Sequence, residues 1–169
     1  MRSFHITLCI LCCLRWVTGF QGLNVGRVSK KSALLSSAGS GEMVYGGLQH
    51  CGILVADTEA SKQFYTEVFG FEDESHLRPT KLPYPGAFLR LGPDQIHLME
   101  LPNPDPTEGR PEHGGRDRHV ALTINNIDFI VERLRQRAHA YTLSKSGRRA
   151  LFTRDLDGNA FEFVEDSSL

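Results

Sequence analysis

The chain has 169 residues, of which 40% are hydrophobic and 23% are charged, and its formal net charge at pH 7 is −1. This size and composition favour one globular domain over two. Five of the 19 basic residues and none of the acidic ones lie in residues 1–40, so 14 basic and 20 acidic residues remain after that segment. The acidic balance argues against nucleic acid or an anionic membrane as the partner of the mature chain.

Residues 1–40 have the layout of a cleaved targeting leader. Arg2 gives a basic start, residues 6–14 (ITLCILCCL) form an apolar core, and residues 16–22 (WVTGFQG) supply small residues suited to cleavage. The core is shorter than the roughly 20 apolar residues that span a bilayer, so we expect no integral membrane segment in the mature chain. The next stretch is basic and Ser-rich, as transit peptides are. The leader resembles the bipartite plastid leader of algae with complex plastids; the alternatives are secretion and a disordered or membrane-anchored N-terminus.

The first half of the mature chain predicts a strand, a helix and further strands. A β-rich run over residues 48–57 ends at an Asp-Thr pair that suits a helix N-terminus. A helix is predicted over residues 59–70, where apolar residues recur at i, i+4 and i+8 and Gly70 ends the run. An irregular strand and a Pro-rich loop follow. A hairpin is then predicted from two strands at residues 87–91 and 95–101, because Gly-Pro-Asp separates them.

The second half repeats this order after a Pro- and Gly-rich loop. A strand precedes a helix predicted over residues 127–140, which has a clear 3.6-residue apolar stripe, and three strands follow, the last two joined by an Asp-Gly turn. The predicted fold class is therefore α+β, with two βαβββ modules that form a curved mixed sheet. The predicted domain spans residues 47–165, made up of module one at 47–102, a loop at 103–117 and module two at 118–165.

Alternation of side chains along a strand places four polar residues on the concave face of this sheet. Val120, Leu122 and Ile124 share the face toward the helices, so His119 points the other way. The same argument gives one inward residue on the first and last strand of each module: His50, His97, His119 and Glu162.

Three imidazoles and a carboxylate that converge in one curved sheet make a ligand set for a divalent first-row metal. A single strand histidine is more often structural than a ligand. The prediction therefore rests on the joint alternation and matched positions of His50, His119 and Glu162.

The segments LQHCGILVAD, FYTEVFGF and QIHLMEL, followed by RHVALTI and DLDGNAFEF, resemble the vicinal oxygen chelate superfamily. That superfamily includes glyoxalase I, extradiol dioxygenases, methylmalonyl-CoA epimerase and the fosfomycin and bleomycin resistance proteins. The resemblance implies a cup of two modules around one metal held by His50, His119 and Glu162. His97 falls where glyoxalase I has its other glutamate. It is either a fourth ligand or catalytic residue, or a concave-face residue without chemistry.

The resemblance implies a small-molecule substrate with neighbouring oxygen atoms and a divalent metal, namely Fe, Ni, Zn or Mn. We expect a glyoxalase I-like lyase or isomerase, with Glu162 or His97 as the base. The alternatives are an Fe(II) extradiol-type dioxygenase that uses His50, His119 and Glu162, and a metal-free ligand-binding protein of the bleomycin-resistance type. The family often pairs modules across a homodimer, so we expect a homodimer, with the cup either within one chain or shared.

Two further residues are candidate substrate contacts. Arg149 could reach the mouth of the cup and hold an anionic group, and Tyr84 could give a polar handle to an apolar wall formed by residues 82–88. The simpler interpretations are a solvated arginine pair and an ordinary surface loop.

Overall fold

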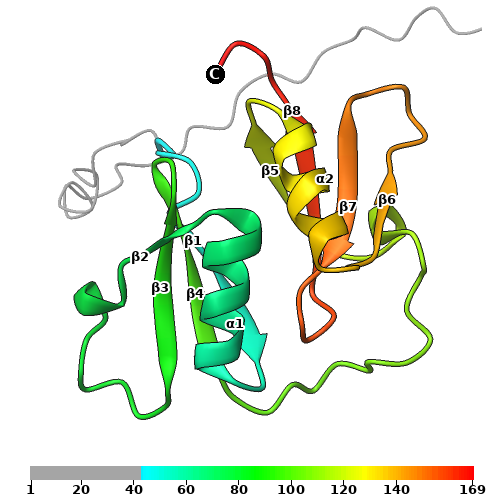
Figure 1. The fold of residues 1–169 in the computed structure, drawn as a ribbon. Helices are drawn as coiled ribbons and strands as arrows, with labels where there is room; N and C mark the ends of the chain where they lie inside the picture. The colour runs from blue at the N-terminus through cyan, green and yellow to red at the C-terminus, as the bar shows by residue number, and fades with distance from the viewer. Residues whose placement is uncertain (1–42) are drawn as a thin grey trace, which may run out of the picture. The chain divides into compact units, whose positions relative to one another are not determined.

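The computed structural model describes residues 43–169, so the leader predicted over residues 1–40 lies outside the described residues. Tyr45–Leu169 forms one compact unit. Within it, two modules with the same order of strands and helix follow one another along the chain (Figure 1). In residues 43–169, none of the helices has the length and apolar character needed to span a bilayer.

The first module pairs its strands in the order β1-β4-β3-β2, with β1 and β4 parallel and the other pairs antiparallel. Its helix α1 continues directly into a π-helical turn, η1, and a short 3-10 turn, η2, follows β2. The elements are β1 (His50–Val55), α1 (Thr58–Phe64), η1 (Tyr65–Phe69), β2 (Glu72–Asp73), η2 (Ser75–Leu77), β3 (Gly86–Leu91) and β4 (Asp94–Glu100).

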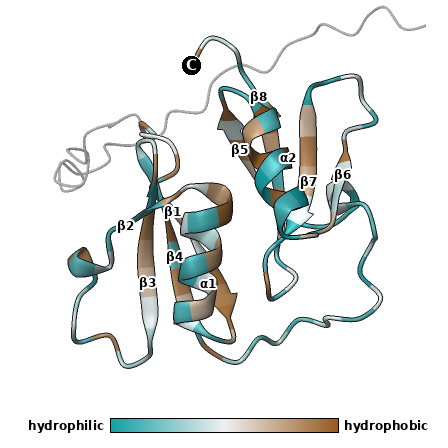
Figure 2. Ribbon diagram, viewed as in Figure 1, coloured by the Kyte–Doolittle hydropathy of each residue, from teal (hydrophilic) through white to brown (hydrophobic). Residues whose placement is uncertain are grey.

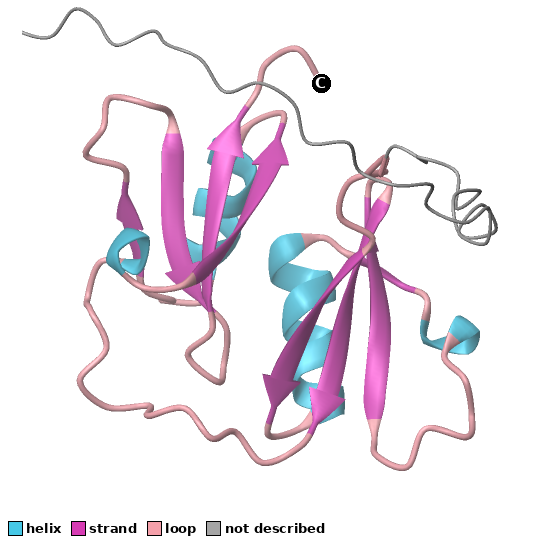
Figure 3. Ribbon diagram, turned by 180° about the vertical axis from the view of Figure 1, so that it is seen from behind, coloured by secondary structure: helices cyan, strands magenta, loops and turns pink. Residues whose placement is uncertain are grey.

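The second module repeats this arrangement in the order β5-β8-β7-β6, again with the first and last strands parallel. Its elements are η3 (Gly114–Arg116), β5 (His119–Ile124), α2 (Ile127–Gln136), β6 (Tyr141–Leu143), β7 (Ala150–Arg154) and β8 (Ala160–Glu165). Each four-stranded sheet carries its α-helix on one face; we call the opposite face, which has no α-helix, the open face (Figure 3). In the second module η3 covers the part of the open face at Phe152 and Ala160. The predicted fold class, α+β with two βαβββ modules, is confirmed.

One apolar core joins the two modules. It contains side chains from both sheets and both helices, and Tyr65 of η1 packs edge-on against Phe161 of β8 at a ring separation of 5.6 Å. Hydrophobic colour follows the strands, whereas the outward sides of the helices are hydrophilic (Figure 2). The face of each sheet that turns away from this core is therefore where polar residues of the strands gather.

The turn between β7 and β8 ties the second module to the first. Asp155 is buried and accepts a hydrogen bond of 2.7 Å from the Tyr65 hydroxyl. Asn159 donates from its side-chain amide to the carbonyl of Leu54 at 3.0 Å. The Asp-Gly turn that the sequence predicted only as a hairpin connection thus also locks β1 and η1 of the other module in place.

Both helices end where local chemistry stops them. The predicted Gly70 terminator is confirmed: it adopts a left-handed conformation with φ of 79°, which glycine accepts without strain. Its N–H donates to the carbonyl of Tyr65, five residues back, which closes the wider π-helical turn. The second helix ends at Gln136, earlier than predicted, and Ala138 turns the chain with φ of 48°.

Candidate metal centre

The predicted ligands occupy matched positions in the two modules. In the parallel pair β1–β4, His97 lies opposite Gly52, and in β5–β8, Glu162 lies opposite Ala121. Each of these small residues follows the first-strand histidine by two positions and so shares its face of the sheet. The two modules therefore present equivalent pairs on their open faces. The pairs are His50 with His97, and His119 with Glu162.

In the second module the two ligand-type groups are in direct contact. His119 Nε2 lies 3.1 Å from Glu162 Oε2, and His119 Nδ1 lies 2.8 Å from the carbonyl oxygen of Asp117. A carbonyl only accepts hydrogen bonds, so Nδ1 carries a proton, and Nε2 faces a carboxylate oxygen that also only accepts. Two acceptor atoms at this distance repel each other unless a proton or a metal cation lies between them.

The residue that orients His119 is itself clamped. Arg110 Nε and Arg154 Nη1 donate to Asp117 Oδ2 at 2.8 and 2.9 Å. The bond from Arg110, together with that from Arg154, holds the pKa of the Asp117 carboxyl far below its usual range despite its partial burial. Asp117 is thus ionised and fixed, and with it the backbone carbonyl that receives the His119 proton.

The first-module pair is a stack of rings. The imidazoles of His50 and His97 are 4.1 Å apart and nearly parallel, and Phe88 covers the other side of His97 at 3.7 Å. His97 Nε2 lies 3.1 Å from the amide oxygen of Gln95, which leaves Nδ1 with a free lone pair. Burial, and then the neighbouring His50, lower the pKa of His97 below its usual value. His97 is therefore held neutral, the form that can ligate a metal or accept a proton.

A phenylalanine completes each pair, and the sequence analysis missed both. Phe88 lies opposite His97 in the hairpin β3–β4, and Phe152 lies opposite Glu162 in β7–β8. Phe152 is buried and presents its ring edge-to-face to His119 at 5.5 Å. Pairing the residues of each hairpin outward from its turn would have placed Phe88 opposite His97, and Phe152 opposite Glu162, from the sequence alone.

The two pairs remain separate within one chain. Across residues 43–169, no three His, Cys, Asp or Glu side chains gather closely enough to hold a metal ion together. The predicted alternation is present in β4: Ile96 and Leu98 are each 1% exposed in the core, while His97 faces the open side. The described part of the chain thus carries two separate pairs of ligand-type side chains, which we call half-sites, rather than one cluster of four.

Arg149 lies away from both pairs. Its guanidinium donates to Glu165 Oε1 at 2.7 Å and lies 3.2 Å from Asp128 Oδ2, at the start of α2. Its neighbour Arg148 instead donates to Glu162 Oε1 at 3.0 Å. Successive residues point to opposite sides of an extended chain. The arginine beside the predicted ligands is therefore Arg148, not Arg149.

Tyr84 contacts Arg78. The Arg78 guanidinium lies 5.3 Å from the centroid of the Tyr84 ring and also donates to the Tyr84 carbonyl. These contacts brace the Pro-rich loop against η2. They leave the predicted role of Tyr84 in the wall of a substrate pocket a prediction.

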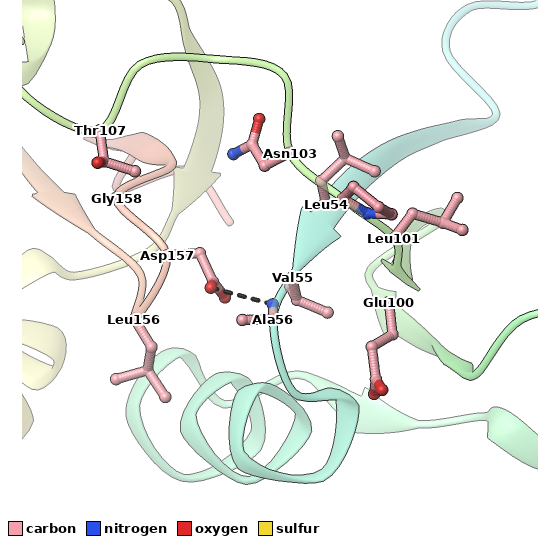
Figure 4. Close-up of a pocket in the computed structure, with 11 residues that line it drawn as sticks. Leu54, Val55, Ala56, Glu100, Leu101, Asn103, Thr107, Leu156, Asp157 and Gly158 are labelled. Carbon is pink, nitrogen blue, oxygen red and sulfur yellow. Dashed lines mark hydrogen bonds between the residues drawn. The ribbon is translucent and has the colours of Figure 1, made fainter.

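A cleft of about 670 Å³ lies elsewhere in Tyr45–Leu169, between the end of β1 and the β7–β8 turn (Figure 4). Its two acidic side chains already have structural partners. Asp157 accepts from the backbone N–H of Ala56 at 3.0 Å, and Glu100 accepts from that of Thr58 at 2.9 Å. Both carboxylates that line the cleft therefore serve to hold backbone N–H groups at the end of β1 and the start of α1.

The two βαβββ modules, each with a histidine and a second ligand-type side chain on one sheet face, define a paired-module βαβββ protein. The sequence pattern of the Glyoxalase/Bleomycin resistance protein/Dioxygenase superfamily matches residues 47–163. The chain belongs to this superfamily, as the resemblance of its motifs implies.

The relatives include proteins with a named activity and proteins without one. YaeR of Escherichia coli strain K12 is 30% identical over 127 residues, which cover 70% of this chain and 95% of YaeR. The mitochondrial methylmalonyl-CoA epimerase of Bos taurus is 29% identical over 120 residues, which cover 67% of each protein. A crystal structure of the fosfomycin resistance protein FosX of Listeria monocytogenes, with Mn(II) and 1S,2S-dihydroxypropylphosphonic acid, shares the fold with a TM-score of 0.57 at 21% identity, covering 72% of this chain and 93% of FosX.

Proposed function

We propose that this protein is a metal-dependent enzyme of the lyase or isomerase type that acts on a small substrate with neighbouring oxygen atoms. The observation that carries the proposal is the contact of His119 Nε2 with Glu162 Oε2 at 3.1 Å, with Nδ1 directed to a fixed carbonyl. Imidazole and carboxylate are donors that zinc, iron, nickel and manganese all accept. Orientation of a histidine through its second nitrogen is typical of metal ligands. The epimerase relative and the Mn(II) in FosX support the same chemistry.

We further propose that a complete site needs two copies of the chain. One copy would supply His119 and Glu162, and the other would supply His50 and His97. The support is that each module presents its pair on an open sheet face and that the two pairs of one chain form separate contacts. A homodimer would then contain two equivalent sites, as expected for two-fold symmetry.

The residues take different roles in such a site. A divalent metal, when bound, supplies positive charge that stabilises negative charge developing on the substrate oxygens. His119 and Glu162 would hold it together with His50. His97 is suited to accept a proton at Nδ1, because its lowered pKa keeps the ring neutral and the stack with Phe88 fixes the ring plane.

The test is the metal content of the purified full chain, measured by plasma mass spectrometry after incubation with Fe(II), Ni(II), Zn(II) and Mn(II). We expect close to one metal per chain. His119→Ala should reduce it to background, and His97→Ala shows whether His97 is a ligand or a base. His76→Ala is the matched control, because His76 is an exposed histidine in η2, away from both pairs.

The metal found also distinguishes the alternatives. Nickel, zinc or manganese agrees with lyase or isomerase chemistry. Iron together with cleavage of catechols would replace the proposal with an extradiol-type dioxygenase. If no metal binds under any of these conditions, the catalytic proposal fails and the metal-free ligand-binding protein becomes the better interpretation.

A further inference from the structure

A basic pocket of about 450 Å³ adjoins the His119–Glu162 half-site. It lies between the segment that contains η3 and the loop that joins β6 to β7. Its lining contains three permanently charged cations and one carboxylate, in a domain whose charged residues are otherwise mainly acidic. The cations are Arg116, Lys145 and Arg148, and the carboxylate belongs to Glu112. We refer to this region as the basic pocket.

The walls of the basic pocket are braced independently of its cations. His113 accepts from the N–H of Gly115 through Nδ1 and lies 3.3 Å from the carbonyl of Leu143 through Nε2. This pattern fixes a neutral tautomer that links η3 to the end of β6. The opposite loop is closed by Ser144, whose N–H donates to the Ala150 carbonyl at 2.8 Å. The pocket is thus a formed feature of the fold.

The cations are available to a ligand. Among residues 43–169, no carboxylate lies within 4.0 Å of the charged groups of Arg116 or Lys145. Arg148 has one acidic partner, Glu162, and its side chain is 60% exposed. A metal that takes up the charge of Glu162 would weaken the hold on Arg148 and leave its guanidinium free to contact an anion.

The basic pocket and the half-site share two residues. Phe152 lines the pocket and also packs against His119, and Arg148 lines the pocket and also bonds Glu162. A small molecule could therefore place oxygen atoms at His119 and Glu162 while an anionic group at its other end reaches the pocket.

We propose that the basic pocket binds an anionic group of the substrate, a carboxylate or a phosphate, through Arg116, Lys145 and Arg148. This inference rests on the proposed function, since it names the substrate class of the same site. Arginine and lysine are the side chains that recognise both groups, arginine through paired N–H donors. The substrate would then be a small anion with neighbouring oxygen atoms.

The test is a two-dimensional NMR titration of the full chain with inorganic phosphate and, separately, with acetate, at constant ionic strength set by sodium chloride. We expect saturable shifts of the backbone amides of Gly115, Ser146 and Gly147. Lys145→Gln and Arg148→Gln should each raise the Kd at least threefold. Arg149→Gln is the matched control, because it removes the same charge from the adjacent residue, and it should change the Kd less than twofold.

The two probes separate the two anion sources. Tighter binding of phosphate indicates a phosphorylated substrate, and tighter binding of acetate indicates a carboxylate. Shifts that do not saturate, or an equal effect of Arg149→Gln, would overturn the proposal. Metal content measured on the same samples keeps the two proposals distinct. Saturable binding of phosphate or acetate without bound metal retains the basic pocket and removes the metal enzyme. Metal binding without saturable binding of either anion retains the metal enzyme and removes the basic pocket.

Discussion

The two half-sites differ in one residue that changes the charge of the whole site. His97 and Glu162 occupy equivalent registers, yet one is a neutral imidazole and the other a carboxylate. A divalent metal in a site with one carboxylate would keep a net positive charge, whereas a second carboxylate in place of His97 would cancel it. We therefore expect the site to favour an anionic substrate, in agreement with the basic pocket proposed beside Glu162.

Asp117 is the residue whose removal should reveal how His119 is oriented. Asp117→Ala removes the carboxylate that Arg110 and Arg154 clamp, so the carbonyl that receives the His119 Nδ1 proton is no longer fixed. We expect metal affinity to fall about 10- to 100-fold, as when other supporting residues of metal ligands are lost. Competition with a fluorescent chelator measures the affinity.

Asp105→Ala is the control for Asp117→Ala, because Asp105 pairs with an exposed neighbouring arginine, Arg118, and does not contact His119. Both variants should remain folded by circular dichroism. Equal metal affinity in the two variants would show that the clamp on Asp117 has no part in orienting the histidine.

His97 should make stability depend on pH in the mildly acidic range. Its pKa is lower in the folded chain than the ordinary value of about 6.5. Above the ordinary pKa the His97 ring is neutral in both the folded and the unfolded chain, so it does not make stability depend on pH. As the pH falls through the ordinary pKa, the unfolded chain binds a proton that the folded chain binds less readily, so the stability of the folded chain decreases. We expect the melting temperature of His97→Phe to fall less between about pH 7.5 and pH 5 than that of the unaltered protein.

The phenylalanine in this variant preserves the stack between Phe88 and His50, the titratable group that contacts His97. His76→Phe serves as the control, since His76 is exposed. An identical loss of melting temperature in all three proteins would mean that His97 titrates in the folded chain as it does in the unfolded one.

At the level of elements, each module uses the carboxylate at the end of its last strand to hold the start of its helix. Glu100 of β4 accepts from the N–H of Thr58 at 2.9 Å, and Glu165 of β8 accepts from that of Ile127 at 3.1 Å. The first N–H groups of a helix have no partner within the helix. The repeat is thus preserved in individual hydrogen bonds between strand and helix.

Glu100→Ala should therefore destabilise the protein by about 1 kcal/mol, the usual cost of losing a side-chain acceptor at a helix N-terminus. Urea unfolding followed by circular dichroism measures the change. Glu108→Ala is the matched control, because Glu108 is exposed in the loop between the modules. If the urea concentration at the midpoint of unfolding shifts no more in Glu100→Ala than in Glu108→Ala, the hydrogen bond from the Thr58 N–H to Glu100 contributes no net stability.

The order of elements was predictable because it depends on local patterns. Apolar periodicity located both helices, Gly70 ended the first, and the short turn at Gly92 gave the hairpin β3–β4. The π-helical turn η1 was not predictable, since periodicity does not distinguish a widened last turn from a regular one.

The site was predictable only in part, because many of its contacts join residues that are far apart in the sequence. Alternation along single strands gave the open-face positions of His50, His97, His119 and Glu162, which needs no knowledge of distant contacts. The partners of each side chain depend on how strands and loops meet, so Arg148 and the clamp on Asp117 were missed. The separation of the four residues into two pairs likewise depends on packing between modules, which no local pattern encodes.

At the scale of the whole molecule, the contact between modules explains why one chain carries two half-sites. Tyr65, fully buried, donates to Asp155, and its ring packs on Phe161 of the other module. These contacts join the helix side of the first module to the second and leave both open sheet faces directed away from the shared core. We therefore expect each open face to meet its counterpart on another copy, as proposed above.

Mixing two defective variants tests this arrangement. His50→Ala/His97→Ala removes one half-site and His119→Ala/Glu162→Gln removes the other, so neither variant alone should bind metal.

If sites are shared across a two-fold dimer, a mixed dimer has one site built entirely from intact residues and one from altered residues. After subunit exchange about half of the dimers are mixed, so we expect about one metal for every four chains. Metal content after gel filtration measures this. A mixture that binds no more metal than its separate components, although mass spectrometry detects mixed dimers, would place the complete site within a single chain.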